Sequence, residues 1–118
     1  MMKILILGAS GSIGQQTLEV IEKYPNNFLL TAFSVGENIF YIDEILKKHP
    51  SVKHICLKNE KDIDVFKVKH PSINFYFGDD GLIDLIQTSD FDMAVNALVG
   101  FVGLLPSVEV LKLIFSSL

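Results

Sequence analysis

A short aliphatic run that leads directly into a glycine-rich turn constrains this chain more than any other feature. The run is Lys3–Leu7, and the segment Gly8–Gly14, with the sequence GASGSIG, follows it. This pattern predicts a strand, a tight turn and the start of a helix. Three glycines spaced three apart remove side chains where the backbone must approach something closely. The unpaired N–H groups at the start of the helix, together with its dipole, form a site for a phosphate anion.

This arrangement is typical of the pyrophosphate site in dinucleotide-binding folds. Similar turns also occur in α/β proteins that bind mononucleotides, phosphosugars or no ligand. A Walker-type loop is excluded, because no Gly-Lys-Ser/Thr follows at the required spacing. The turn therefore predicts dinucleotide binding.

Strand-like and helix-like segments alternate along the chain with short connections. They predict a single α/β domain, residues 1–118, with a Rossmann-like, doubly wound parallel sheet and helices on both faces. The expected strands are 3–7, 28–35, 54–57, 73–77 and 93–97. The expected helices are 12–24, 38 to before Pro50, 60–69, 82–88 and one that begins near Gly103, with caps at Asn38, at Asn59 and in the turn Gly78–Gly81.

Right-handed crossovers place the second, third and fourth strands on one side of the first strand and the fifth on the other. In such a sheet the ligand lies at the carboxyl ends of the strands where the strand order reverses. The segments Gly8–Gly14, Ser34–Asn38 and Asn96–Gly100 are therefore expected to surround one crevice.

Composition excludes several classes of function. The net charge of −4 at pH 7 and the pI near 5.2 argue against a nucleic-acid partner or an anionic membrane surface. Cys56 lies in an apolar run and is expected to be a buried structural thiol. His49, His54 and His70 lack metal-ligand spacing and are expected at the surface or at strand edges.

No targeting or membrane segment is indicated. The apolar run before the glycine turn is too short for a secretory signal. The uncharged stretch 93–108 is shorter than a membrane span of about 20 residues. A cytoplasmic protein is expected. No Ser-His-acid constellation is present, so the sequence indicates a binding site but no catalytic or metal site.

Three segments resemble those of one family. Residues 7–21, LGASGSIGQQTLEVI, closely resemble the opening of the 1-deoxy-D-xylulose 5-phosphate reductoisomerases. Residues 33–38, FSVGEN, are similar to that family's second-strand loop, and residues 96–106, NALVGFVGLLP, to its Val-Gly-x-x-Gly-Leu-x-Pro segment. The resemblance implies an NADPH-binding domain of an oxidoreductase of the non-mevalonate isoprenoid pathway. The complete enzyme isomerises its substrate and reduces the product with NADPH to 2-C-methyl-D-erythritol 4-phosphate.

The resemblance also implies which residues meet the cofactor. Ser10, Gly11, Ser12 and Ile13 would hold the NADPH pyrophosphate, and Gly36 and Asn38 would meet the adenosine end. The full set of expected cofactor-binding residues is Gly8, Ser10, Gly11, Ser12, Ile13, Gly36, Glu37, Asn38 and Ala97. A divalent metal, Mg or Mn, is expected only in the full-length enzyme, and family members are homodimers.

Glu37 departs from the family pattern, which often has lysine there. Two geometries remain open: Glu37 accepts a hydrogen bond from a ribose 2′-hydroxyl and favours NADH, or it faces solvent and NADPH is preferred. The second is favoured, because Glu37 would start a helical first turn where a carboxylate is stabilised by the dipole.

Family members are much longer than this chain, and Lys112–Leu118 no longer follows the family pattern. A fragment, an interrupted gene or a frameshift product is expected, without reductoisomerase activity of its own. Two alternatives stay open: a stand-alone or degenerate nucleotide-binding domain, and another Gly-x-x-Gly-x-x-Gly reductase such as a semialdehyde dehydrogenase.

Overall fold

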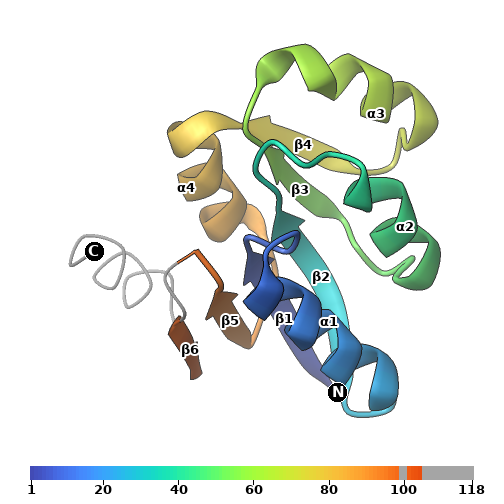
Figure 1. Ribbon diagram of the computed structural model, residues 1–118, viewed down its shortest axis with the longest axis vertical. Coiled ribbons are helices and arrows are strands. Elements are labelled where there is room, and N and C mark those ends of the chain that lie inside the picture. Colours follow the sequence, from blue (N-terminus) through green and yellow to red (C-terminus); the bar gives the residue numbers. More distant parts are fainter. Residues whose placement is uncertain (99–100, 105–118) are drawn as a thin grey trace.

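The computed structural model describes residues 1–98 and 101–104 of the chain (Figure 1). Strands and helices alternate from the N-terminus, as the sequence predicts. The elements are β1 (Met2–Leu7), α1 (Ser12–Lys23), β2 (Phe28–Ser34), α2 (Tyr41–Lys48), β3 (His54–Leu57), the 3₁₀ helix η1 (Glu60–Asp62), α3 (Ile63–Lys69), β4 (Asn74–Phe77), α4 (Gly78–Thr88), β5 (Met93–Asn96) and β6 (Phe101–Leu104).

The sheet has the strand order β4-β3-β2-β1-β5-β6. The first five strands run parallel, and β1 pairs with both β2 and β5. The chain order therefore reverses at β1, so the predicted order of five parallel strands is confirmed.

The expected helix start near Gly103 is wrong. Gly103 lies in β6, which pairs antiparallel with β5 so that Ala94 stands opposite Gly103. β6 pairs with the edge of β5 that β1 leaves free. The rest of the predicted helix, beyond residue 104, lies outside the described residues.

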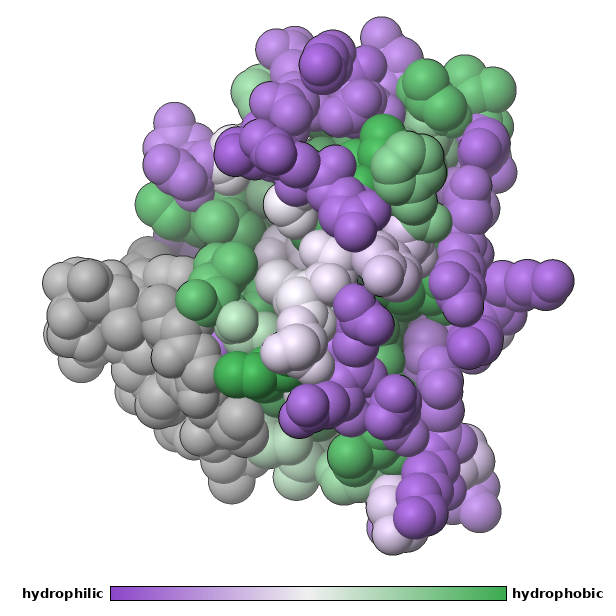
Figure 2. All heavy atoms as spheres, in the orientation of Figure 1, coloured by the Kyte–Doolittle hydropathy of each residue, from purple (hydrophilic) through white to green (hydrophobic). Residues whose placement is uncertain are grey.

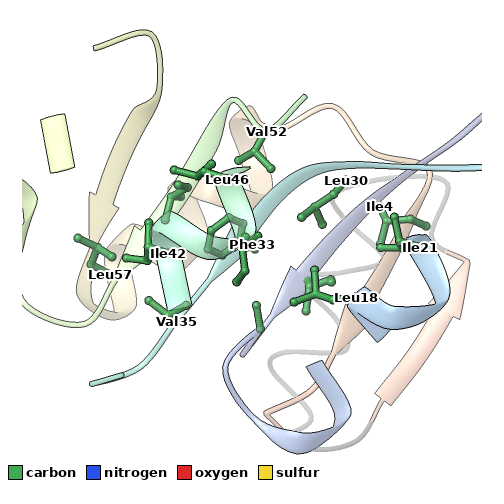
Figure 3. Close-up of a cluster of buried hydrophobic side chains, with 14 of the residues drawn as sticks. Ile4, Leu18, Ile21, Leu30, Phe33, Val35, Ile42, Leu46, Val52 and Leu57 are labelled. Carbon is green, nitrogen blue, oxygen red and sulfur yellow. The ribbon is translucent and has the colours of Figure 1, made fainter. Parts of the chain in front are cut away.

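Helices cover both faces of the sheet, as predicted. Figure 1 shows α4 on the opposite side of the sheet from α2 and α3. The larger apolar core lies under α1, α2 and α3, and Figure 3 shows Phe33 of β2 beside Ile42 and Leu46 of α2. A second cluster joins Leu85 and Ile86 of α4 to the other face.

An irregularity in β2 decides which of its side chains face which layer. The pairing of β1 with β2 shifts register between Ile4 and Leu5, and Thr31 falls at the shift. The Thr31 hydroxyl donates to the carbonyl oxygen of Asp90 at 2.8 Å. Leu30 and Phe33 consequently belong to the same core cluster although they are three residues apart, which simple strand alternation does not give.

Two helix starts differ from the prediction. α2 begins at Tyr41 and not at Asn38, because a backbone bond from the N–H of Ile39 to the carbonyl of Glu37 at 3.0 Å makes a turn there. α4 begins at Gly78 and not at residue 82. Asp79 and Asp80 therefore lie within its first turn, where the dipole favours carboxylates, and no side chain caps the helix.

The expected helix 60–69 is divided into η1 and α3. Asn59 occupies the N-cap position of η1, but its side chain makes no capping hydrogen bond. A tight 3₁₀ turn at a helix start is common, because i to i+3 bonds use donors that an α-helical start leaves free.

The placement of His49 at the surface is also wrong. Its side chain is 8% exposed, and Nε2 lies 3.3 Å from Oε1 of Glu22 on α1. Burial lowers the His49 pKa, although the Glu22 carboxylate acts in the opposite direction. Cys56 is buried, as expected.

Polar side chains cover much of the outer surface of α2 and α3 (Figure 2). Figure 2 shows hydrophilic residues along the α2 and α3 side, with an apolar group beside α3. Within the described parts of the chain, no helix has the length and apolar character needed to cross a membrane.

Candidate functional site

The carboxyl ends of β2, β1 and β5 lie side by side at one edge of the sheet, and the glycine turn leaves β1 at this edge. Hydrogen bonds join the three strand ends. The Gly8 N–H donates to Oγ of Ser34 at 2.9 Å, and the Ala9 N–H donates to the Ser34 carbonyl at 2.8 Å. On the other side the Ala97 N–H donates to the Leu7 carbonyl at 2.8 Å. The loops after β2 and β5 are therefore fixed to the start of the turn.

Gly8 makes the sharp exit from β1. Its φ is +83°, a left-handed conformation that strains other residues. A Cβ there would stand 3.1 Å from Cδ2 of Leu98 and 3.4 Å from its backbone nitrogen. Glycine at this position therefore serves both the turn and its contact with the loop after β5.

The other two glycines of the motif have different roles. A Cβ on Gly14 would fall 2.2 Å from the Gly8 carbonyl oxygen and 2.7 Å from Cα of Ala9, so Gly14 lets α1 pack directly on the turn. A Cβ on Gly11 would meet only the Gly8 carbonyl oxygen, at 3.5 Å, which is ordinary van der Waals contact. Among the described residues, nothing therefore requires glycine at residue 11, and they leave space for a side chain there.

The N-terminus of α1 opens at this edge. Gly11 is the N-cap, no side chain caps the helix, and the first turn carries no acidic residue. Gly11, Ser12 and Ile13 are exposed, and the turn is braced by Nε2 of Gln15, which donates to the Ser10 carbonyl at 2.8 Å. The amides of this first turn have no intrahelical partners and are suited to an anion such as a phosphate.

The loop after β2 provides the second wall. Gly36, Glu37 and Asn38 are exposed, and in the described part of the chain no residue except the neighbours of Gly36 comes within 4 Å of a Cβ built on it. The Glu37 side chain is 77% exposed and its Oε1 lies 3.0 Å from Nζ of Lys58. Because α2 begins only at Tyr41, the helical first turn expected around Glu37 is absent, and the carboxylate is paired with a lysine instead.

The loop after β5 provides the third wall. Asn96 is buried at the end of β5, and its Oδ1 accepts a hydrogen bond from the Leu98 N–H at 3.2 Å. Its Nδ2 has no partner among the described residues. A buried amide donor without a partner is costly, so this group is available to an acceptor brought by a ligand. Ala97 is half-buried beside it.

All nine residues expected to bind a cofactor thus lie at one edge of the sheet, Ser12 and Ile13 in the first turn of α1 and the other seven in loops. The sequence pattern did not single out Ser34 or Lys58. For Ser34 the signal was a hydroxyl at the end of a mostly apolar segment. For Lys58 the signal was the predicted pairing of the second and third strands, because this pairing brings the residue after Leu57 close to the loop 35–38.

The described part of the chain contains no cluster of side chains suited to binding a metal ion. Across residues 1–98, no three His, Cys, Asp or Glu side chains come together in a group that could hold a metal ion. Burial raises the pKa of the Cys56 thiol to about 12, with smaller contributions from Asp84 and Asp79. That thiol is therefore not a nucleophile at neutral pH.

Comparison with known proteins agrees with this geometry. The family model of 1-deoxy-D-xylulose 5-phosphate reductoisomerase matches residues 4–114. The chain belongs to this family. Its relatives include the reductoisomerase of Macrococcus caseolyticus, which is 38% identical over 113 residues, and that of Listeria innocua, which is 38% identical over 112 residues. Each alignment covers 95% of this chain and 29% of the relative, so the chain spans less than a third of the length of these reductoisomerases.

Solved reductoisomerase structures share the fold. A structure described as the reductoisomerase in complex with NADPH, fosmidomycin and magnesium superposes with a TM-score of 0.73 at 25% identity, over 82% of this chain and 24% of that one. The reductoisomerase of Zymomonas mobilis in complex with NADPH gives a TM-score of 0.67 at 22% identity, over 79% of this chain and 24% of that one.

Proposed function

We propose that this chain, residues 1–118, is the NADPH-binding domain of a 1-deoxy-D-xylulose 5-phosphate reductoisomerase. In the complete enzyme this domain would serve the isomerisation and NADPH-dependent reduction that yield 2-C-methyl-D-erythritol 4-phosphate in the non-mevalonate isoprenoid pathway. Family membership and the relatives solved with NADPH support the proposal.

The residues at the strand ends suit the parts of a dinucleotide. The amides of Ser12 and Ile13, with Ser10 and Gly11 beside them, would hold the pyrophosphate at the N-terminus of α1. Gly8 and Ser34 would keep the turn in position for that contact. Gly36, Glu37 and Asn38 would lie at the adenosine end, and Ala97 would form the wall on the β5 side.

The cofactor supplies a hydride when bound. The part of this chain is to bind and orient it, and we propose no catalytic or metal-binding residue among residues 1–118. A divalent metal, Mg or Mn, would be held in the remainder of the complete enzyme, as the magnesium in a solved relative suggests.

The observation that carries this proposal is the difference between Gly11 and Gly14. The fold needs Gly14 for close packing, whereas at Gly11 it has room for a side chain. Glycine at an exposed position where the protein would accept a Cβ is explained by a ligand that approaches the backbone there.

The experiment is a calorimetric titration of the chain with NADPH. Wild type should bind, and Gly11→Val should lose at least about tenfold in affinity, equivalent to about 1.4 kcal/mol, because the new side chain occupies the pyrophosphate space. Gln16→Val is the matched control: it places the same β-branched side chain on an exposed face of α1 away from the turn. Unchanged affinity in a folded Gly11→Val protein would contradict the site.

We expect the 118-residue chain to bind NADPH without turnover. Its described residues hold no metal-ligand group, and it spans less than a third of its relatives. An assay with the ketose phosphate, NADPH and Mg²⁺ or Mn²⁺ tests this. Metal-dependent oxidation of NADPH, in a preparation free of host enzyme, would contradict the expectation.

We further infer a cytoplasmic protein whose ligand is a small molecule. A small-molecule ligand is supported by the relatives solved with NADPH. The chain has 14 Asp and Glu residues but only 10 Lys and Arg residues, and this negative net charge is unfavourable for binding nucleic acid. The homodimer implied by the family resemblance is a proposal for the complete enzyme, and its oligomeric state would be measured on that enzyme.

A further inference from the structure

Glu37 and Lys58 form an ion pair at the ends of two neighbouring strands. Glu37 follows β2, Lys58 directly follows β3, and the two strands are parallel with Ser34 opposite Cys56. Nζ of Lys58 lies 3.0 Å from Oε1 of Glu37, and the two side chains are 57% and 77% exposed. Both side chains therefore leave the sheet at the edge where the glycine turn of β1 lies.

This edge is where dinucleotide-binding folds distinguish their cofactors. An acid after the second strand accepts a hydrogen bond from the ribose 2′-hydroxyl, whereas a nearby cation accommodates a 2′-phosphate. Glu37 taken alone would favour the cofactor without the phosphate. In the structure, however, the Glu37 carboxylate already has the Lys58 ammonium beside it, and the pair carries no net charge. The cofactor preference expected from Glu37 alone therefore does not follow.

Lys58 can serve a second acceptor while it keeps the first. A lysine ammonium has three donors, and Glu37 uses one of them. The position beside the pair is also open among the described residues, since none of them except the chain neighbours of Gly36 comes within 4 Å of a Cβ on Gly36. A phosphate at this place would meet an exposed ammonium.

No other cation is available in the segments at this edge. The chain contains no arginine, so its ten basic residues are all lysines. Lys58, the residue directly after β3, carries a positive charge, whereas the segments 8–14, 34–38 and 96–98 contain no basic residue. A cofactor phosphate placed here would therefore depend on Lys58.

We propose that Lys58 binds the 2′-phosphate of NADPH and sets the preference for the phosphorylated cofactor, with Glu37 as the counter-ion of this lysine and not as the acceptor for a ribose hydroxyl. The inference rests on the NADPH-binding function proposed above. It assigns the choice between NADPH and NADH to Lys58 at the end of β3, and not to a residue in the loop after β2.

The test measures the dissociation constants of NADPH and NADH by calorimetry on the full chain. Lys58→Met should lower the ratio of NADPH to NADH affinity by about tenfold or more, the effect expected for a hydrogen bond to a charged group. Lys58→Arg should keep the preference for NADPH. Glu37→Gln should raise the NADPH affinity, because it removes the carboxylate that shares the Lys58 ammonium with the phosphate.

Lys53→Met is the matched control. It removes the same charge just before β3, at the opposite end of that strand and roughly 16 Å away at about 3.3 Å per residue. That separation exceeds the screening length of about 8 Å at physiological salt, so the affinity ratio should stay within about twofold. Thermal melting checks that every variant is folded.

The outcomes separate the two proposals. If both cofactors bind but Lys58→Met leaves the ratio unchanged, or lowers it no more than Lys53→Met, the assignment of Lys58 is overturned and the binding function stands. If Glu37→Gln weakens NADH by tenfold, Glu37 is the ribose acceptor and the assignment is likewise overturned. If wild type binds neither cofactor, the binding function fails and the assignment fails with it.

Discussion

The Gly8 backbone amide donates a hydrogen bond of 2.9 Å to the buried hydroxyl oxygen of Ser34. It ties the first residue of the glycine turn to the last residue of the neighbouring strand. The two residues are 26 positions apart in the chain, and only the parallel pairing of β1 with β2 brings them together. The position of the proposed pyrophosphate site thus depends on a side chain outside the glycine motif.

Replacing Ser34 with Ala should therefore affect both stability and binding. The Gly8 amide would lose its acceptor in a buried place, which costs about 1–3 kcal/mol of unfolding free energy. NADPH affinity should also fall, because the turn loses its anchor. Denaturant unfolding and calorimetric titration measure the two effects.

Ser51→Ala is the control for that change. The Ser51 hydroxyl donates to the Leu30 carbonyl at 2.6 Å, also in β2 but away from its carboxyl end. This variant should lose stability while NADPH affinity stays within about twofold of wild type. Equal effects of the two variants on affinity would show that Ser34 has no special connection with the site.

Gly14→Ala should destabilise the fold. Alanine in a helix interior gains about 1 kcal/mol over glycine from propensity. The new Cβ, however, would fall 2.2 Å from the Gly8 carbonyl oxygen, which is backbone and cannot move aside without shifting the turn. Overpacking of this kind costs about 1–3 kcal/mol or more and outweighs the gain.

Gly36→Ala provides the comparison, since nothing lies within 4 Å of its Cβ. Its unfolding free energy should remain within about 0.5 kcal/mol of wild type. A melting temperature of Gly14→Ala at or above that of wild type would contradict the close packing of α1 on the turn.

The stability of the fold should decrease as the pH falls below about 6.5. Burial lowers the pKa values of His49 and His54 below their ordinary value of 6.5. The unfolded chain therefore binds protons at a pH where the folded chain does not, and each group lowers the unfolding free energy by at most about 1.4 kcal/mol per pH unit. For His49, Glu22 opposes this shift and Lys48 supports it.

Urea unfolding at pH 7.5, 6.5 and 5.5 measures this dependence. The double variant His49→Gln, His54→Gln should have a flatter profile over this range. The lowered pKa of Asp43, held by His70 and Lys69, acts only at more acidic pH, because its ordinary value is 3.8. An identical slope for wild type and the double variant would show that the two histidines are not the cause.

Cys56 should react with alkylating reagents very slowly in the folded protein. Raising a thiol pKa from 9.0 to about 12 lowers the thiolate fraction at pH 8 by about three orders of magnitude, and the side chain is also buried. Iodoacetamide labelling followed by mass spectrometry should give a modified product only in denaturant. Rapid labelling at pH 8 without denaturant would contradict the burial of this residue.

Local patterns were enough to predict which segments lie at the proposed site. The aliphatic run, the glycine spacing and the alternation of strands and helices depend on residues near one another in the chain, and handedness rules fix the order of parallel strands. These determine the fold class, the three loops at the strand ends and the glycine turn. Helix starts were predicted less well: the turn at Glu37–Ile39 and the early start of α4 at Gly78 depend on backbone bonds that residue preferences do not specify.

Tertiary structure alone decided the features that need distant residues to meet. The pairing of Ser34 with Gly8, the ion pair of Lys58 with Glu37 and the antiparallel addition of β6 all depend on strand register. The shift at Thr31 shows why: one added residue changes which side chains of β2 face each layer, and no local preference records it. The sequence by itself therefore predicted the loops that form the proposed dinucleotide site, and the packed sheet decided which side chains anchor the turn and which charged groups lie beside it.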